Sequence, residues 1–213
     1  MPWRHLPRRT TEALVTIGIL GAGAVAQALA IRLTAGGHTV VLSNRRGPDS
    51  LTRLTAEIGP GVTAGPVDDV MQFPRVVIAI PWSQLPATLG RVTDWDNRIV
   101  VDTSNPIEPP HFTVADLGGR ASSEVVADLV PGGRLVKAFN TLTPRVLALD
   151  PREAGGHRVI FFSGDDADAK SQFGAVLTSS GFAGVDLGSL AVGARLQQFP
   201  GGPLPALNLI RLG

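Results

Sequence analysis

Residues 15–46, VTIGILGAGAVAQALAIRLTAGGHTVVLSNRR, contain a strand pattern, a glycine turn, a helix pattern and a second strand pattern in succession. The β-branched run at 15–20 suits a strand that is buried on both faces. Residues 25–33 carry apolar side chains at helical spacing, and the pattern ends at Gly36-Gly37. A strand, a glycine turn and a helix in this order predict a β-α-β unit that binds a dinucleotide.

The turn has glycines at positions 21 and 23 and an alanine at 26. The first glycine permits a tight turn, the second lets a pyrophosphate approach the backbone, and the small third residue lets helix and strand pack closely. The first amides of the helix would face the phosphates. The predicted cofactor-binding residues of the turn are Gly21, Ala22, Gly23, Ala24, Val25 and Ala26.

The end of the second strand predicts which dinucleotide is bound. An NAD site usually has an acid at this point, whereas this chain has Ser43-Asn44-Arg45-Arg46, and its first acid is Asp49. A guanidinium on a 2′-phosphate contributes about 1.5 to 3 kcal/mol. The sequence therefore predicts NADP(H); a solvated surface pair of arginines is the alternative interpretation.

The remaining chain continues to alternate between strand and helix patterns. Strands are predicted at 62–64, 76–80, 99–102, 135–139, 159–163 and 185–187, and helices at 50–58, 67–71, 123–129, 167–180 and 206–212. This alternation predicts an α/β fold with a doubly wound, mainly parallel sheet of the Rossmann type and a small C-terminal α/β extension.

Three segments follow from this interpretation. Residues 1–12 form a tail that we predict to be disordered, 13–150 form the NADP-binding domain, and 151–213 form an extension that completes the sheet and closes the pocket. Arg8-Arg9 before an apolar run also fits a secretory signal. Because the run is broken by glycines at turn spacing and supplies the first strand, the signal and a membrane helix are the less favoured interpretations.

Three strand patterns end in polar or turn-forming residues, namely Pro81-Trp82, Asn105-Pro106 and Asn140-Thr141. Ligands of such sheets bind outside the carboxyl ends of the strands, so these residues are predicted to converge on a second site. An ordinary Asn-Pro turn and a core position for Trp82 are the alternatives. Residues 107–120 are long for a connection and are predicted to be a lid or a flexible loop.

Composition narrows the possible chemistry. The 213 residues carry a net charge of +1, so no charge pattern indicates nucleic acid or a membrane surface as a partner. The chain has no cysteine, which is compatible with a reducing, cytoplasmic compartment. It has no tyrosine for a Tyr/Lys proton relay and no cluster with metal-ligand spacing, so no metal is predicted. Hydride transfer between two flat cofactors needs mainly alignment, and we assign no catalytic residue.

Nearly the whole chain after the tail resembles the coenzyme F420-dependent NADP oxidoreductases. The motifs that carry this resemblance are GAGAVA (21–26), SNRR (43–46), AIPW (79–82), SSEVVA (122–127), VKAFNTL (136–142) and GDD (164–166). AIPW and VKAFNTL are the most specific of these, since a generic dinucleotide fold requires neither. The resemblance implies NADP(H) as cofactor and the deazaflavin coenzyme F420 as second substrate.

The resemblance also implies roles for individual residues. Asn44 and Arg45 would bind the 2′-phosphate, Ile80-Pro81-Trp82 would flank the nicotinamide, and residues 140–142 would hold the deazaflavin ring. Two departures are Asn44 where serine or threonine is common and Asn140 where a histidine is common. The predicted cofactor-binding residues outside the turn are Ser43, Asn44, Arg45, Arg46, Ile80, Pro81, Trp82 and Asn105, and the predicted substrate-binding residues are Trp82, Asn105, Pro106, Asn140, Thr141 and Leu142.

Three functional hypotheses follow. The first is hydride transfer between NADP(H) and a deazaflavin. The second is NADPH-dependent reduction of a small imine or carbonyl compound on the same scaffold. The third is a non-catalytic NADP-binding sensor. In each case we expect a cytoplasmic homodimer with small-molecule ligands and no nucleic-acid or membrane partner.

Overall fold

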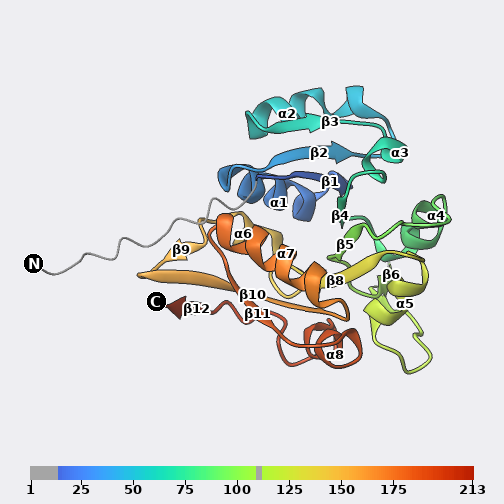
Figure 1. Cartoon of the computed structure of the whole chain (residues 1–213), viewed down its shortest axis with the longest axis vertical. Coiled ribbons are helices and arrows are strands. Elements are labelled where there is room, and N and C mark those ends of the chain that lie inside the picture. The colour runs from blue at the N-terminus through green and yellow to red at the C-terminus, as the bar shows by residue number, and fades with distance from the viewer. Residues whose placement is uncertain (1–13, 109–111) are drawn as a thin grey trace, which may run out of the picture.

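The computed structural model describes residues 14–108 and 112–213. Its central sheet has the strand order β11-β10-β8-β5-β4-β1-β2-β3, and the short strands β9 and β12 pair with β10 (Figure 1). The strands are β1 (Thr16–Leu20), β2 (Thr39–Ser43), β3 (Val62–Ala64), β4 (Arg75–Ile78), β5 (Ile99–Asp102), β6 (Ile107–Glu108), β7 (Thr113–Val114), β8 (Arg134–Ala138), β9 (Arg152–Glu153), β10 (Gly156–Gly164), β11 (Ala183–Asp186) and β12 (Ile210–Leu212).

Helices connect most of these strands. The α-helices are α1 (Ala24–Ala35), α2 (Thr52–Ile58), α3 (Val67–Val70), α4 (Leu85–Leu89), α5 (Ser122–Asp128), α6 (Pro144–Ala148), α7 (Ala167–Ser179) and α8 (Arg195–Gln197). Shorter helical turns are η1 (Pro48–Leu51), η2 (Trp82–Gln84) and the π-helical turn η3 (Leu190–Ala194).

Strands β3, β2, β1, β4, β5 and β8 are all parallel, and β1 lies between β2 and β4. Strand β10 then adds antiparallel to β8, and β11 adds parallel to β10. The order reverses at β1, as in doubly wound folds, so the predicted α/β fold with a mainly parallel sheet is confirmed. Strands β10 and β11 also extend the sheet as expected.

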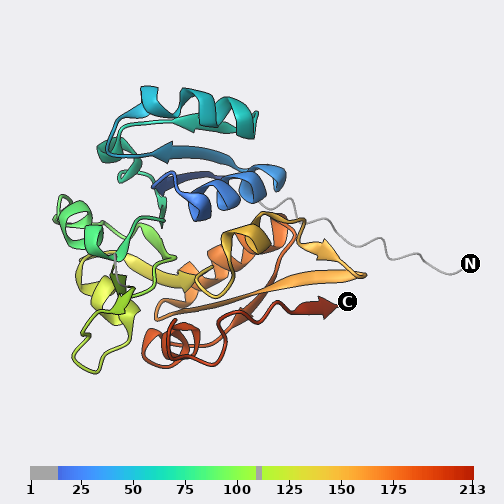
Figure 2. The same ribbon diagram turned by 180° about the vertical axis from the view of Figure 1, so that it is seen from behind.

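A hydrophobic core lies on each face of the sheet. One core is formed by buried side chains of α1, α6 and α7, and the other by those of α3, α4 and α5. The view from behind shows the N-terminal and C-terminal elements at opposite ends of the sheet (Figure 2). Both faces of the central strands are therefore covered, and the carboxyl ends of the strands are the edge from which ligand-binding loops emerge.

The prediction of a helix at 206–212 is wrong. Residues 210–212 form β12, which pairs antiparallel with residues 156–158 of β10. Strand β10 extends beyond its neighbours and offers backbone groups that a strand can pair with, whereas a helix could not. Leu209 and Leu212 are 44% and 68% exposed, so the apolar composition of this segment does not reflect burial in this chain.

Residues 107–120 contain two short strands, and their predicted role as a lid or a flexible loop stays a prediction. Strands β6 and β7 pair antiparallel, with Ile107 opposite Val114. Residues 109–111 lie outside the described residues, as do 1–12, so the predicted disorder of that tail lies there too. Among the described residues, no helix is long and apolar enough to cross a membrane, and no group of three or more His, Asp or Glu residues could hold a metal ion.

His38 joins the first β-α-β unit to α7. The ring is buried, its Nε2 lies 2.8 Å from the Ser179 hydroxyl, and its Nδ1 accepts from the Val15 amide at 3.4 Å. Burial, together with the positive charge of Arg75, lowers the pKa of His38. The Val15 amide requires an unprotonated Nδ1, so the folded chain holds the neutral ring.

We expect acid to destabilise the fold through His38. The folded-state pKa lies below that of the unfolded chain, so the unfolded state binds a proton first as the pH falls below about 6.5, and the free energy of unfolding decreases. Urea unfolding at pH 7.5 and pH 5.5 measures this loss. In His38→Gln the loss should be smaller; an equal loss in both proteins would contradict the assignment.

Candidate functional site

The turn after β1 is held by a backbone contact that excludes a side chain. Gly21 has a φ of +116°, and a Cβ built on it would lie 2.2 Å from the carbonyl oxygen of Ala79. The Gly21 amide donates to the carbonyl of Ser43 at 2.9 Å. Gly21 therefore joins the carboxyl ends of β1, β2 and β4, as the predicted tight turn requires.

Helix α1 begins directly after this turn with a free N-terminus. Gly23 is its N-cap, no side chain caps it, and its first turn contains no acid. No described atom lies within 4 Å of a Cβ built on Gly23, so this position opens to solvent. Ala26 is buried in the core, where its small side chain lets α1 approach the sheet. The unpaired amides of the first turn of α1 suit an anion such as a pyrophosphate.

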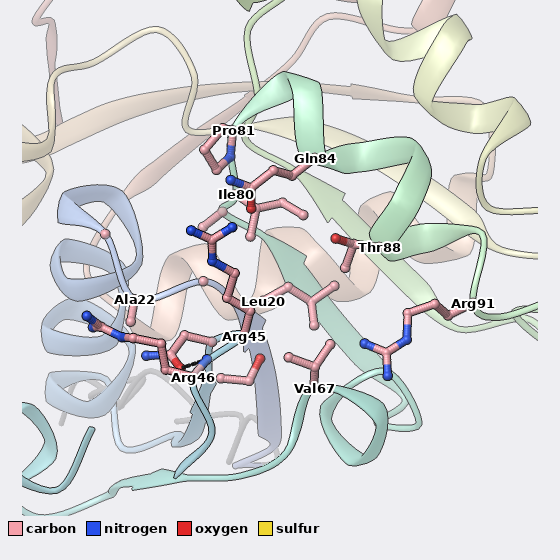
Figure 3. Close-up of a pocket in the computed structure, with 15 residues that line it drawn as sticks. Leu20, Ala22, Arg45, Arg46, Val67, Ile80, Pro81, Gln84, Thr88 and Arg91 are labelled. Atoms are coloured by element: carbon pink, nitrogen blue, oxygen red, sulfur yellow. Dashed lines mark hydrogen bonds between the residues drawn. The ribbon is translucent and has the colours of Figure 1, made fainter. Parts of the chain in front are cut away.

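A cavity of about 440 Å³ lies in front of this turn, a volume typical of small-molecule sites. Its lining comes from the ends of β1 and β2, from α3 and from the segment after β4 (Figure 3). The lining residues are Leu20, Gly21, Ala22, Gly23, Ser43, Asn44, Arg45, Arg46, Val67, Ala79, Ile80, Pro81, Gln84, Thr88 and Arg91. The cavity thus contains most of the predicted cofactor-binding residues.

Arg45 and Arg46 supply the positive charge of the cavity. Both are exposed, and within the described residues neither guanidinium group has an ion-pair or hydrogen-bond partner. Figure 3 shows Arg45 extending into the cavity toward Pro81 and Gln84. Two unpaired guanidinium groups at the end of β2 are the arrangement that a 2′-phosphate requires.

Asn44 shapes the loop that carries these arginines. Its Oδ1 accepts from the Arg46 amide at 2.8 Å, and its Nδ2 donates to the Ser50 hydroxyl at 3.0 Å. The Ser50 hydroxyl in turn donates to the carbonyl of Gly47 at 2.7 Å. The side chain of Asn44 therefore fixes the loop conformation, and its predicted phosphate contact remains a prediction.

The nicotinamide-side residues are divided between two cavities. Ile80 and Pro81 line the 440 Å³ cavity, whereas Trp82 lines a separate cavity of about 240 Å³. That second cavity is also lined by Leu117 and by Val125 of α5. Trp82 is half-buried against the core formed by α3, α4 and α5. The structure thus brings Trp82 together with the segment that follows the β6–β7 hairpin.

Asn105 and Asn140 lie side by side, as their positions at strand ends predict. The Asn140 Nδ2 donates to the Asn105 Oδ1 at 3.0 Å, and the Asn105 Nδ2 donates to the Asn140 carbonyl at 3.2 Å. Three contacts with the C-terminal extension hold this pair. The Asn140 Nδ2 donates to the Gln197 carbonyl at 2.7 Å, the Phe199 amide donates to the Asn105 Oδ1 at 3.3 Å, and the Gln197 Nε2 donates to the Asn140 Oδ1 at 3.5 Å.

The backbone just before this pair is strained. Phe139 has a φ of +64°, which is uncommon for a bulky residue, and its ring packs edge-on against Phe173 and Phe182. Such a conformation costs on the order of 1–3 kcal/mol and persists where packing imposes it. It ends β8 and turns the chain so that Asn140 meets Asn105.

The other predicted substrate residues are covered. Pro106, Thr141 and Leu142 are buried, Leu142 packs into a hydrophobic core, and the Thr141 carbonyl accepts from the Ala206 amide at 2.7 Å. None of the three lines the 440 Å³ cavity. Their predicted contact with a second substrate remains a prediction.

Comparisons with known proteins indicate the family. Residues 16–106 match the family described as NADP oxidoreductase coenzyme F420-dependent. This segment, somewhat less than half of the chain, belongs to that family. The predicted family and oxidoreductase class are thereby confirmed. The matched residues include every residue that lines the 440 Å³ cavity.

Two solved structures resemble this chain over most of its length. A hypothetical protein, SMa0349, from Sinorhizobium meliloti is 46% identical, with a TM-score of 0.88 over 94% of this chain and 98% of that one. A candidate F420-dependent NADP reductase from Arthrobacter sp. FB24 is 27% identical, with a TM-score of 0.67 over 82% and 84% of the two chains.

Among curated proteins, the chain resembles part of a larger metalloreductase. It is 29% identical to metalloreductase STEAP3 of Rattus norvegicus over 192 residues, which cover 89% of this chain and 37% of the rat protein. The chain therefore spans little more than a third of the length of that relative. A reductive aminase from Aspergillus terreus solved with NADPH shares the fold at 19% identity and a TM-score of 0.60.

Sequence reasoning missed one side of the cavity. Gln84, Thr88 and Arg91 line it from η2, α4 and the turn after α4, and Arg91 is held by Asp68 of α3 at 2.5 Å. The available signal is the strand at 76–80, since a segment that follows a strand of such a sheet can border the ligand site. The sequence predicts neither helix α4 after that strand nor the pairing of β4 with β1.

Two alanine substitutions should separate folding from binding. Gly23→Ala should leave the melting temperature nearly unchanged, because its Cβ meets only open space, yet weaken NADPH binding about tenfold by blocking the pyrophosphate. Gly21→Ala should destabilise the fold by about 1–3 kcal/mol, since its Cβ would collide with Ala79. Thermal unfolding and NADPH titration test both. Full NADPH affinity in Gly23→Ala would show that the phosphates bind elsewhere.

Proposed function

We propose that this chain transfers a hydride between NADP(H) and the deazaflavin coenzyme F420. The observation that carries the proposal is that the guanidinium groups of Arg45 and Arg46 have no partner among residues 14–108 and 112–213 and lie beside a helix N-terminus without a side-chain cap. Membership of a family named for both reactants supports it. The cavity of about 440 Å³ suits the adenosine and pyrophosphate half of NADP(H).

The sheet topology supports an extended position for the cofactor. The 2′-phosphate would meet Arg45 and Arg46 after β2, and the pyrophosphate would meet the amides at the start of α1. The nicotinamide would then lie beyond Ile80 and Pro81 at the end of β4, toward Asn105 after β5. The cofactor would thus extend from the open cavity toward the Asn105–Asn140 pair.

The chemistry makes few demands on the protein. NADPH supplies the hydride from its nicotinamide C4, and a deazaflavin accepts it at C5. The chain has no tyrosine, and among the described residues we find no histidine in the cavity lining. The contribution of the protein would be to align the nicotinamide and deazaflavin rings and to exclude water. Alignment alone can supply about 7 to 11 kcal/mol of the activation barrier.

A smaller acceptor is the second candidate. Asn140 and Thr141 are 7% and 4% exposed, because the C-terminal extension covers them. A flat tricyclic ring would need room at these residues, whereas a small imine or carbonyl compound would need less. The reaction with such a substrate also requires a proton, which water or the substrate itself would supply.

A direct assay tests the first proposal. The protein is mixed with NADPH and oxidised coenzyme F420, and loss of the deazaflavin absorbance is followed. We expect bleaching that depends on both reactants, and less of it with Gly23→Ala. Bound NADPH without bleaching would remove the first proposal, and a panel of imines and carbonyl compounds would then separate the second from a non-catalytic sensor.

The base preference gives a second prediction. Arg45→Ala should weaken NADPH binding roughly ten- to a hundredfold, because a charge-assisted contact to the 2′-phosphate is lost, and change NADH binding by less than about twofold. Isothermal titration with both nucleotides measures this. Arg53→Ala is the matched control, since the Arg53 side chain is 92% exposed on α2 and, in the part of the chain that the structure describes, pairs only with Glu57. An equal loss for NADPH and NADH would contradict phosphate recognition.

The homodimer and the cytoplasmic location also remain proposals. Exposed apolar side chains of the C-terminal extension, including Val192 at 61% and Leu212 at 68%, support the homodimer. A sedimentation experiment on the purified chain decides this point.

A further inference from the structure

A fully buried ion pair lies beneath the strand ends, outside the cavity. Lys137 of β8 and Asp102 of β5 are neighbours in the parallel register, and both side chains have no exposed surface. The Lys137 Nζ donates to the Asp102 Oδ2 at 2.9 Å. Burial lowers the pKa of Lys137, and the Asp102 carboxylate opposes this shift. A lysine is rarely buried completely, so a fully buried Lys–Asp pair at this position needs a physical explanation.

Most contacts of the pair converge on one residue. The amide and the hydroxyl of Ser104 donate to the Asp102 Oδ1 at 2.8 and 2.6 Å, and the Lys137 Nζ donates to the Ser104 carbonyl. The Ser123 hydroxyl donates to the Asp102 Oδ2 at 3.0 Å. The amide, hydroxyl and carbonyl of Ser104 are thus all bound by the ion pair. The buried ion pair therefore fixes the turn after β5 through these hydrogen bonds to Ser104.

The next residue, Asn105, is the one that points to a ligand. It is half-exposed, and among the described residues its Nδ2 has one acceptor, the Asn140 carbonyl, although a primary amide has two hydrogens to donate. Asn105 follows β5, which pairs with β4, and β4 leads into the cavity residues Ile80 and Pro81. Asn105 does not line the cavity itself, but among the described residues one N–H of its side chain is unpaired at the end of the strand beside β4.

We infer that the Lys137–Asp102 pair is a positioning device that fixes the Ser104 turn, so that Asn105 donates its remaining N–H to the carboxamide oxygen of the nicotinamide. The inference rests on the proposed NADP(H) function and specifies how the reactive end of the cofactor is held. Lys137 and Asp102 do not touch the ligand. A rigid amide donor at this point would fix the rotation of the nicotinamide ring and hence which face is presented to the acceptor.

A pair of ligands isolates the nicotinamide contact. NADPH is compared with 2′-phosphoadenosine diphosphoribose, which has the same phosphates and lacks the nicotinamide. In the neutral double variant Lys137→Met/Asp102→Asn, no unpaired buried charge remains. We expect its Kd for NADPH to rise roughly tenfold, as expected for a lost hydrogen bond of ordinary strength, and its Kd for the truncated ligand to stay within about twofold.

A matched control and a second variant complete the design. Lys170→Met/Asp186→Asn removes a Lys–Asp pair of 3.0 Å between α7 and β11 and should change neither Kd. Asn105→Ala removes the proposed donor itself, and should reproduce the selective loss of NADPH affinity even where the double variant folds poorly. Thermal unfolding monitors the fold of each variant.

The outcomes are distinct. If the wild-type chain binds neither ligand, the proposed NADP(H) function fails and the inference with it. The wild type can instead bind both ligands. If Asn105→Ala or a folded double variant then keeps the wild-type ratio of the Kd for NADPH to the Kd for the truncated ligand, the inference is overturned while NADP(H) binding stands. An equal loss for both ligands would overturn it too, because it would show a general structural role. Only a loss confined to NADPH supports it.

Discussion

The approach of Gly21 to the carbonyl of Ala79 is the constraint on which the site depends. No side chain fits between them, so only glycine allows the turn after β1 to pass this close to the end of β4, and the amide of Gly21 also bonds the end of β2. The N-terminus of α1 consequently stands over three strand ends. The amides at the start of α1, the two arginines and the side chain of Ile80 all lie around the cavity next to this contact.

Sequence reasoning succeeded where the determinants were local. Strand and helix periodicity, glycine stereochemistry and the absence of an acid after β2 are properties of adjacent residues, and they predicted both the fold and the arginine side of the cavity. Arg91 was missed because its place in the cavity depends on β4 lying beside β1, a long-range pairing. The helix predicted at 206–212 was wrong because a short apolar run does not distinguish helix from strand, and the partner strand β10 lies about 50 residues earlier.

The strand-end asparagines show a different limit. Their convergence was predictable, since parallel strands bring their carboxyl ends together. The residues that bond to them were not predictable, because Gln197 at the end of the short helix α8 and Phe199 just after it lie in a segment without a distinctive sequence pattern. Gln197 is itself completely buried, and its amide reaches the carbonyl of Phe161 at 3.0 Å. The C-terminal extension is thereby anchored to the sheet beneath the asparagine pair.

The two halves of the site consequently differ in their exposure to solvent and in their polar contacts. The half at β1 and β2 is open and carries unpaired cations, so it can adapt to a flexible, highly charged nucleotide. The half at β5 and β8 is a closed polar network with a buried ion pair, a strained Phe139 and a covering segment. Closed polar networks have few alternative arrangements, because each broken hydrogen bond leaves a buried group unsatisfied. Selectivity for the acceptor would therefore come from the fixed shape of this half, and a change of acceptor would require coordinated changes at 104–106, 139–142 and 197–199.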